Sequence, residues 1–181
     1  MRIVAGTWAG RSLTSPGQRV RATAEAVRAA WLDALESRLR GAKVLELFAG
    51  SGALGLEALS RGSASVDFVE SGASALHALK ANVAAFRLRP PGTGKSTARR
   101  KTARIFKRDA IPFVQTMPAL TYDLAFADPP YRSAKLELVV ARWMGVPFAR
   151  VLGVEHAVDH IIPEGGRRLE VGETVVTLYG L

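Results

Sequence analysis

The stretch KVLELFAGSGALGLEALSRGSASVDFVE, residues 43–70, decides the fold of this chain. It predicts, in order, a strand at 43–48, a helix at 53–61 and a strand at 65–70. Between the first strand and the helix, Gly50, Gly52 and Gly55 have the spacing G-x-G-x-x-G. Because glycine has no Cβ atom, such a loop turns tightly and lets a ligand approach the backbone at the N-terminus of the helix. We therefore expect a nucleotide-like cofactor at this loop.

Strands and helices keep alternating after this stretch. Further strands are predicted at 103–109, 122–128 and 150–156, with helices at 72–86, 111–117 and 134–144. The final segments RRLEV and TVVTLYG predict a hairpin that adds antiparallel strands at one edge. The pattern indicates an α/β fold with a mostly parallel seven-stranded sheet, helices on both faces, and ligands at the carboxyl ends of the strands.

The N-terminal part precedes this alternating pattern. Residues 2–5 and 11–14 predict a short β-hairpin, and a helix is predicted from Thr23, which is a possible N-cap. Apolar residues spaced four apart along that helix predict a buried face: Val27, Trp31, Leu35 and Leu39. We interpret residues 1–40 as an extension of a single domain that spans residues 1–181.

The composition excludes several classes of chemistry. The chain has no cysteine, which excludes disulfides and thiolate catalysis, and its three histidines are scattered, so we expect no metal site. No apolar run approaches the ~20 residues that span a bilayer. We therefore expect a cytoplasmic protein with no membrane partner.

The positive charge is concentrated in one segment. Residues 87–108 contain nine Lys and Arg residues and no acidic residue, whereas the remaining 16 basic residues balance the 16 acidic ones. A run of this density predicts a solvated loop or arm that suits a polyanionic partner. The alternative is a loop that only improves solubility.

RPPGTGKST, residues 89–97, resembles the phosphate-binding loop of an ATPase. That motif is G-x-x-x-x-G-K-[ST], and its first glycine is replaced here by Arg89. The preceding text, ALHALKANVAAF, predicts a helix rather than the buried strand that such a loop follows. The sequence therefore disfavours an NTPase.

Three carboxylates end the predicted strands next to the glycine loop. Glu70 lies 20 residues after Gly50, where a carboxylate can bind both hydroxyls of a ribose. Glu46 precedes the loop, where an anion favours the sulfonium and ammonium groups of S-adenosylmethionine (SAM) over the pyrophosphate of NAD. Asp109 could accept a hydrogen bond from an adenine amino group, or it could cap the helix that follows.

The fourth predicted strand ends in Asp128-Pro129-Pro130-Tyr131. Two consecutive prolines cannot continue a β-ladder, so the chain must leave the sheet in a rigid turn at its carboxyl edge. The turn offers a carboxylate and carbonyl oxygens to the N–H groups of an exocyclic amine, and the tyrosine ring can stack on the base. Methyl transfer to such an amine requires mainly positioning, without a metal ion.

The chain closely resembles the RsmD type of bacterial methyltransferase, which methylates guanine N2 in small-subunit (16S) ribosomal RNA. Two stretches carry the resemblance: LELFAGSGALGLEALSRGSASVDFVE and DLAFADPPY. The resemblance extends to MRIVAGTWAGRSL, VRATAEAVRAAWLDAL and GVEHAV, and so covers most of the chain. It implies a Rossmann-like class I SAM-dependent methyltransferase, with ribosomal RNA or a small-subunit assembly particle as partner and a monomeric state. An amino-methyltransferase of DNA adenine or cytosine or of another RNA, and a non-catalytic RNA-binding module, remain alternatives.

The resemblance and the patterns assign three groups of residues. The cofactor site is expected to contain Glu46, Phe48, Ala49, Gly50, Ser51, Gly52, Glu70, Asp109 and Ala110. The catalytic turn is expected to contain Asp128, Pro129, Pro130 and Tyr131. RNA contacts are expected from Arg11, Arg21, Arg28, Arg99, Arg100 and Lys101, with helix-surface charge as the alternative for the N-terminal arginines. The chain departs from the family's R-P-T-T-D-R-V-R-E and Y-G-D-T patterns, having RATAEAVRA and VGET instead, and this leaves the target nucleotide open.

Overall fold

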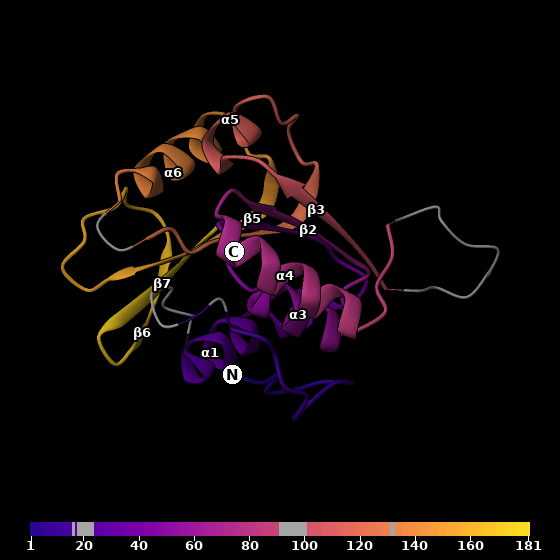
Figure 1. The fold of residues 1–181 in the computed structure, drawn as a ribbon. Helices are drawn as coiled ribbons and strands as arrows, with labels where there is room; N and C mark the ends of the chain where they lie inside the picture. Colours follow the sequence, from indigo (N-terminus) through magenta and orange to yellow (C-terminus); the bar gives the residue numbers. More distant parts are fainter. Residues whose placement is uncertain (16, 18–23, 91–100, 131–132) are drawn as a thin grey trace.

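Seven strands form one sheet (Figure 1) in the order β3-β2-β1-β4-β5-β7-β6. The computed structural model describes residues 1–15, 17, 24–90, 101–130 and 133–181. The strands are β1 (Lys43–Leu47), β2 (Ser65–Glu70), β3 (Thr102–Lys107), β4 (Tyr122–Ala127), β5 (Ala149–Ala157), β6 (Arg167–Val171) and β7 (Thr174–Tyr179). The first five are parallel, and β7 pairs antiparallel with both β5 and β6. The predicted sheet is confirmed, including the antiparallel hairpin at one edge.

Helices cover both faces of the sheet. They are α1 (Glu25–Ala34), α2 (Glu36–Leu39), α3 (Ala53–Ser60), α4 (Ala73–Ala85), α5 (Ala110–Gln115) and α6 (Lys135–Gly145). Figure 1 shows α5 and α6 on one side and α1, α3 and α4 on the other. Successive residues of β1 feed the two resulting cores: Val44 packs with the α1, α3 and α4 residues, and Leu45 and Leu47 pack under α5 and α6. This alternation explains why the strand has a continuous apolar sequence. Within the described residues, no helix is long and apolar enough to span a membrane.

The N-terminal hairpin is shorter than the sequence predicts. It contains one antiparallel bridge, between Arg2 and Ser12, supported by backbone hydrogen bonds such as the 3.0 Å bond from Ile3 N to Arg11 O. The tip of this segment lies against the end of α3, because a Cβ atom on Gly6 would stand 2.3 Å from Ser60 O. The segment is therefore held by α3 rather than by a long ladder of its own.

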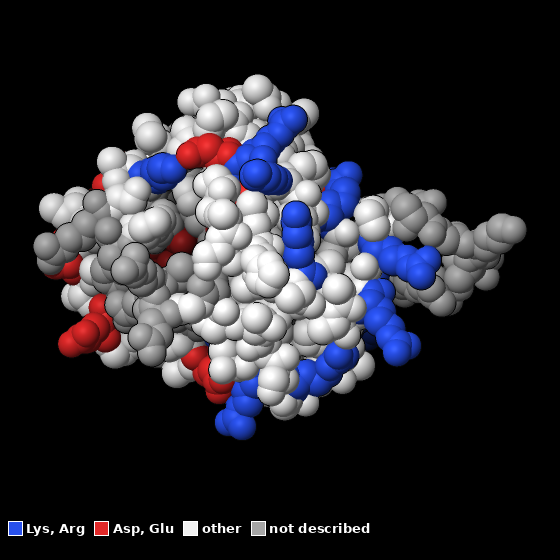
Figure 2. Space-filling view, viewed as in Figure 1, with Lys and Arg blue, Asp and Glu red and all other residues white. Residues whose placement is uncertain are grey.

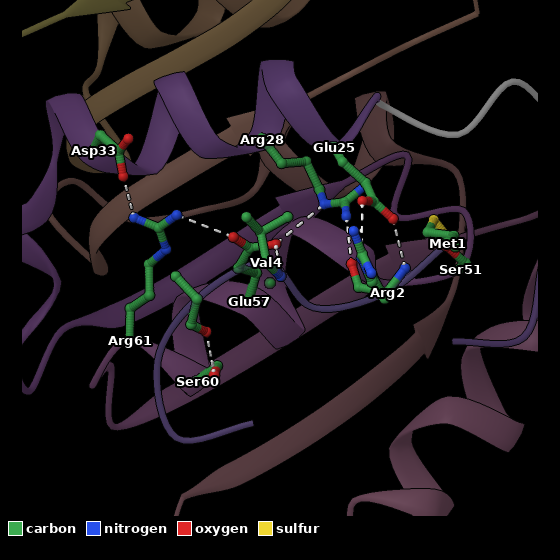
Figure 3. Close-up of polar contacts among 12 residues, drawn as sticks. Met1, Arg2, Val4, Glu25, Arg28, Asp33, Ser51, Glu57, Ser60 and Arg61 are labelled. Atoms are coloured by element: carbon green, nitrogen blue, oxygen red, sulfur yellow. Dashed lines mark hydrogen bonds and ion pairs between the residues drawn. The ribbon is translucent and has the colours of Figure 1, made fainter. Parts of the chain in front are cut away.

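A buried ion-pair network joins the N-terminal segment and α1 to α3 (Figure 3). The side chains of Arg28 and Glu57 are both 0% exposed, and Arg28 Nε donates to Glu57 Oε2 at 3.3 Å. Arg28 also donates to the backbone oxygen of Arg2 at 2.7 Å. Glu57 accepts further hydrogen bonds from Val4 N and from Arg61 Nη2, at 3.3 and 3.0 Å. A carboxylate that is removed from water is stabilised by this set of donors.

This network corrects one of the sequence predictions. Arg28 was expected to contact RNA, but it is fully buried and its guanidinium points to Glu57. An arginine with no exposed surface cannot bind a phosphate backbone in solution. The sequence suggested an exposed helix charge because the partner carboxylate lies 29 residues further along the chain.

We predict that Glu57→Gln lowers the free energy of unfolding by about 3–5 kcal/mol, because it leaves the Arg28 charge buried without its counter-ion. Urea unfolding followed by circular dichroism measures this change. The exposed pair of Arg2 and Glu25 provides the control, and Glu25→Gln should cause a much smaller loss. The double variant Arg28→Met/Glu57→Met should recover much of the stability, because it removes both charges. Equal losses in Glu57→Gln and Glu25→Gln would contradict the role of the buried pair.

Candidate functional site

The glycine loop leaves β1 through three residues in the left-handed region. Phe48, Gly50 and Gly52 have φ angles of +55°, +56° and +76°. A Cβ atom on Gly52 would lie 2.5 Å from Leu79 Cδ1, and one on Gly55 would lie 2.5 Å from Glu46 Oε2. The backbone conformation therefore favours glycine at 50 and 52, and close packing on neighbouring side chains requires it at 52 and 55. The positive φ of Phe48 is unusual for a large side chain and marks the start of the turn.

Glu70 fixes the other side of the loop. Its Oε2 accepts a 2.8 Å hydrogen bond from Gly50 N, and its Oε1 accepts from Ser71 N and Gly72 N at 2.8 and 2.6 Å. The carboxylate is half-buried at the end of β2. Because a carboxylate has about four acceptor sites, it can still accept from the hydroxyl groups of a ribose. This arrangement fits the ribose-binding role predicted for Glu70.

Glu46 lies directly under the start of α3. It is 6% exposed and accepts a 2.8 Å hydrogen bond from Gly55 N. Burial, together with the nearby negative charge of Asp128, raises the pKa of Glu46 to about 8, against the opposing effects of the Gly55 N–H group and of Arg28. Two carboxyl groups, one from β1 and one from the end of β4, therefore influence each other in the same region. A cation placed between them would be stabilised by both.

Asp109 caps α5, as one of the two interpretations of the sequence expected. Its carboxylate accepts from Ile111 N at 2.9 Å and from Lys135 Nζ at 2.7 Å. The hydrogen bond from Lys135, and then that from Ile111, hold the pKa of Asp109 below its usual value. Ala110 follows as the first residue of α5 and is buried. Adenine binding by Asp109 stays a prediction.

Lys135 is a residue of this region that the sequence analysis missed. It begins α6, and its ammonium lies 5.8 Å from the centre of the Phe48 ring as well as beside Asp109. Lys135 therefore connects the glycine loop with the start of α5. No local sequence pattern predicts these contacts, because Lys135, Phe48 and Asp109 are distant along the chain. They come together only because α6 begins at this edge of the sheet.

The proline turn follows β4 at the same edge of the sheet. In the parallel register, Ala127 lies beside Leu47 of β1 and beside Val154 of β5, so Asp128 leaves the sheet between the ends of these strands. Pro129 and Pro130 line a small pocket whose walls also include Ser133, Leu136, Glu155, His156, Ala157 and His160. Tyr131 lies outside the described residues. Within those described, no group of three or more His, Asp or Glu side chains could hold a metal ion.

The residues expected to contact RNA fall into three groups. Arg11 is exposed, and its guanidinium lies 4.0 Å from the centre of the Phe86 ring. Lys101 lies 4.6 Å from the centre of the Trp8 ring, and partial burial lowers its pKa. Arg28 is buried, as described above, and the others lie outside the described residues: Arg21, Arg99 and Arg100. RNA binding by Arg11 and Lys101 stays a prediction.

Only the first two residues of the RPPGTGKST segment, Arg89 and Pro90, are among the described residues. Arg89 forms a parallel bridge with Thr102 at the start of β3. In Figure 2, many Lys and Arg side chains lie on the side of β3 and α4, whereas several Asp and Glu side chains lie on the opposite side.

The whole chain resembles known proteins in both sequence and structure. Residues 1–171 match the family described as Conserved hypothetical protein 95. The chain belongs to this family. The predicted resemblance to the RsmD type is confirmed: ribosomal RNA small subunit methyltransferase D of Escherichia coli K12 is 34% identical over 140 residues, covering 76% of this chain. That alignment spans 63% of the length of the Escherichia coli relative. The Haemophilus influenzae protein of the same name is 27% identical over 188 residues, covering 100% of this chain and 92% of the relative.

Solved structures confirm the fold. The Escherichia coli protein yhhF is 30% identical with a TM-score of 0.79, and the superposition covers 99% of this chain and 96% of that one. The 16S rRNA N2 G1207 methyltransferase of Thermus thermophilus, solved with AdoMet and guanosine, is 20% identical with a TM-score of 0.59, covering 87% of this chain and 43% of that one. The second likeness concerns the fold alone. This chain therefore has the Rossmann-like class I methyltransferase fold that the sequence predicts.

We predict that Glu46 lowers the free energy of unfolding of the ligand-free protein as the pH rises from about 5 to about 8. Its pKa is about 8 in the folded protein against an ordinary value of 4.5, so over this range the unfolded chain has lost a proton that the folded protein retains. Below this range both states are protonated, and above it both are ionised, so the pH dependence disappears at both ends. Chemical unfolding at several pH values measures the effect, and Glu46→Gln should remove this fall. Parallel curves for the two proteins would show that Glu46 does not titrate in this way.

Proposed function

We propose that this chain transfers a methyl group from SAM to the exocyclic N2 amine of a guanine in small-subunit (16S) ribosomal RNA. The observation that carries the proposal is the meeting of the glycine loop, the carboxyl groups of Glu46 and Asp128, and the proline turn at one edge of the sheet. The names of the relatives support the substrate class, since they are small-subunit methyltransferases. We further propose that the chain acts as a single monomeric domain on ribosomal RNA or on an assembling small subunit in the cytoplasm.

The residues of the site fit SAM. Glu70 would accept from the ribose hydroxyls, and Gly50, where an added Cβ atom would meet nothing closer than Phe48 O at 4.0 Å, leaves room for a cofactor beside the loop. Glu46 and Asp128 supply negative potential for a ligand that carries an ammonium and a sulfonium group. When bound, SAM supplies an electrophilic methyl group. The raised pKa of Glu46 means that a cationic ligand also favours the ionised form of this carboxyl group.

The turn at the end of β4 would position the amine. Asp128 and the proline carbonyls are acceptors for its N–H groups, and Pro129 and Pro130 hold these acceptors in a rigid conformation. The Asp128 carboxylate also favours the positive charge that develops on the nitrogen during methyl transfer. Positioning and electrostatic stabilisation therefore account for the chemistry that the residues of this chain can provide.

The proposal predicts that the purified protein incorporates labelled methyl groups from SAM into small-subunit RNA. The assay uses naked 16S RNA and small subunits isolated from cells that lack this protein, and nucleoside mass spectrometry identifies the product as N2-methylguanosine. Methylation of adenine or cytosine would assign the chain to another class of amino-methyltransferase. SAM-independent RNA binding without methyl transfer to either substrate would indicate a non-catalytic binding module, and would contradict the proposal.

A second prediction separates chemistry from cofactor binding. Asp128→Ala should lower the rate of methyl transfer by at least about 100-fold, because it removes the acceptor that orients the amine. SAM affinity, measured by isothermal titration calorimetry, should change much less. Asp123 is a matched control because it is the second residue of the same strand, at the opposite end from Asp128, where it accepts from Lys43 N at 2.8 Å. Asp123→Ala should retain the transfer rate. Equal losses of SAM affinity and rate in Asp128→Ala would contradict its assigned role.

A further inference from the structure

The pocket beside the proline turn has a second wall formed by β5 and the segment after it. Pro129 and Pro130 lie on one side, and Glu155 and His156 of β5 lie on the other with His160. Ser133 and Leu136, from the start of α6, close a third side. The pocket therefore lies beside the proline turn, where the target amine is expected.

Glu155 is the acidic residue on this wall. The last paired residues of β4 and β5 on this edge are Ala127 and Val154, so Asp128 and Glu155 are the next residue of each neighbouring strand. Adjacent strands are about 4.8 Å apart. Glu155 is 5% exposed and is among the residues that line the pocket. The register thus makes Asp128 and Glu155 neighbours at the strand ends where the amine is expected.

The two histidines of the wall are engaged with the protein itself. Both ring nitrogens of His156 lie 2.8 Å from protein oxygens, those of the Ala157 backbone and of Thr177 Oγ1, and burial lowers the pKa of His156. His160 Nε2 lies 2.9 Å from Glu137 Oε1. The rings therefore shape the pocket, and Glu155 is its acidic lining residue.

The Watson–Crick edges of the bases differ at the atom next to the amine. In guanine, the ring nitrogen N1 beside the 2-amino group carries a hydrogen and is a donor. In adenine and cytosine, the ring nitrogen beside the amino group carries a lone pair and is an acceptor. A carboxylate is an acceptor only. A second carboxylate beside the amine site therefore attracts guanine and repels adenine and cytosine.

We propose that Glu155 selects guanine by accepting the N1–H hydrogen bond while Asp128 and the proline carbonyls accept from the 2-amino group. This inference rests on the proposed function, and it names the residue that gives that function its base specificity. It also explains why two carboxyl groups occupy neighbouring strand ends in a site whose chemistry needs only one acceptor for the amine.

2-Aminopurine is the probe that isolates this interaction. It carries the same 2-amino group as guanine, but its N1 is unprotonated and is an acceptor. The experiment compares methyl transfer to small-subunit RNA with guanine, or with 2-aminopurine, at the nucleotide that the methylation assay identifies. Wild-type protein should prefer guanine by about 10- to 100-fold in kcat/KM, since a hydrogen bond to a charged group is replaced by a repulsion.

Glu155→Gln tests the residue itself. Its carboxamide can donate to the unprotonated N1 of 2-aminopurine, so the preference for guanine should shrink by at least about tenfold. The measured quantity is the ratio of kcat/KM for guanine to kcat/KM for 2-aminopurine, compared between variant and wild type. The different intrinsic reactivity of the two bases and the loss of O6 contacts affect both proteins alike and cancel in this comparison. Asp67→Asn is the control, because Asp67 is a buried carboxylate of β2 that pairs with Arg104 and Tyr122, away from this pocket. Asp67→Asn should leave the preference at the wild-type value.

The outcomes separate this inference from the function on which it rests. Absence of any methyl transfer by the wild-type protein would overturn both. Guanine methylation with equal use of 2-aminopurine by the wild-type protein would overturn the role of Glu155 alone, and this result does not depend on the folding of any variant. An unchanged preference in a folded Glu155→Gln protein, with both rates lowered together, would also overturn it and indicate a structural role. A reduced preference in Glu155→Gln but not in Asp67→Asn supports the inference.

Discussion

The hydrogen bond from Gly55 N to the buried carboxyl group of Glu46 joins the end of β1 to the first turn of α3, and the site is arranged around it. Glycine at position 55 permits this close approach, because a Cβ atom there would lie 2.5 Å from Glu46 Oε2. The close approach lets α3 begin directly above the strand end, and this in turn places the backbone of Gly50 against Glu70. The spacing of the glycines is therefore a packing requirement of this helix and strand as well as a requirement of the ligand.

The same helix is held from its other face by the N-terminal part of the chain. Glu57, one turn beyond the glycine loop, binds Arg28 of α1 and Val4 of the N-terminal segment, and Ser60 Oγ accepts a 2.8 Å hydrogen bond from Trp8 N. The N-terminal segment and α1 thus support the glycine loop indirectly, through their contacts with α3. A buried charge without its partner is costly. The N-terminal segment and α1 must therefore pack against α3 in the arrangement that completes the pair of Arg28 and Glu57, or the free energy of unfolding falls.

The fold was predictable from the sequence because its signals are local. Apolar runs such as that of β1 and the alternation of strands with helices depend on neighbouring residues, and so does the glycine spacing. The side-chain partners were not predictable in the same way. Arg28 has the sequence of an exposed helix charge and is buried because of Glu57, and Lys135 reaches Asp109 only through the path of α6. Glu155 looks like an ordinary strand residue until the register places it next to the proline turn. What the sequence lacked was the set of contacts between distant segments.

The distribution of charge gives the two parts of the molecule different roles. The edge that would hold cofactor and base carries the carboxyl groups of Glu46, Asp128 and Glu155, which repel the phosphates of an RNA where they are ionised. Under the proposed function, RNA affinity would then come from basic residues elsewhere, such as Arg11 on the N-terminal segment and the Lys and Arg side chains on the side of β3 and α4. Phosphate contacts of this kind position a nucleic acid without reading its sequence. Base recognition would fall to the edge beside the proline turn, where an uncharged base meets no such repulsion.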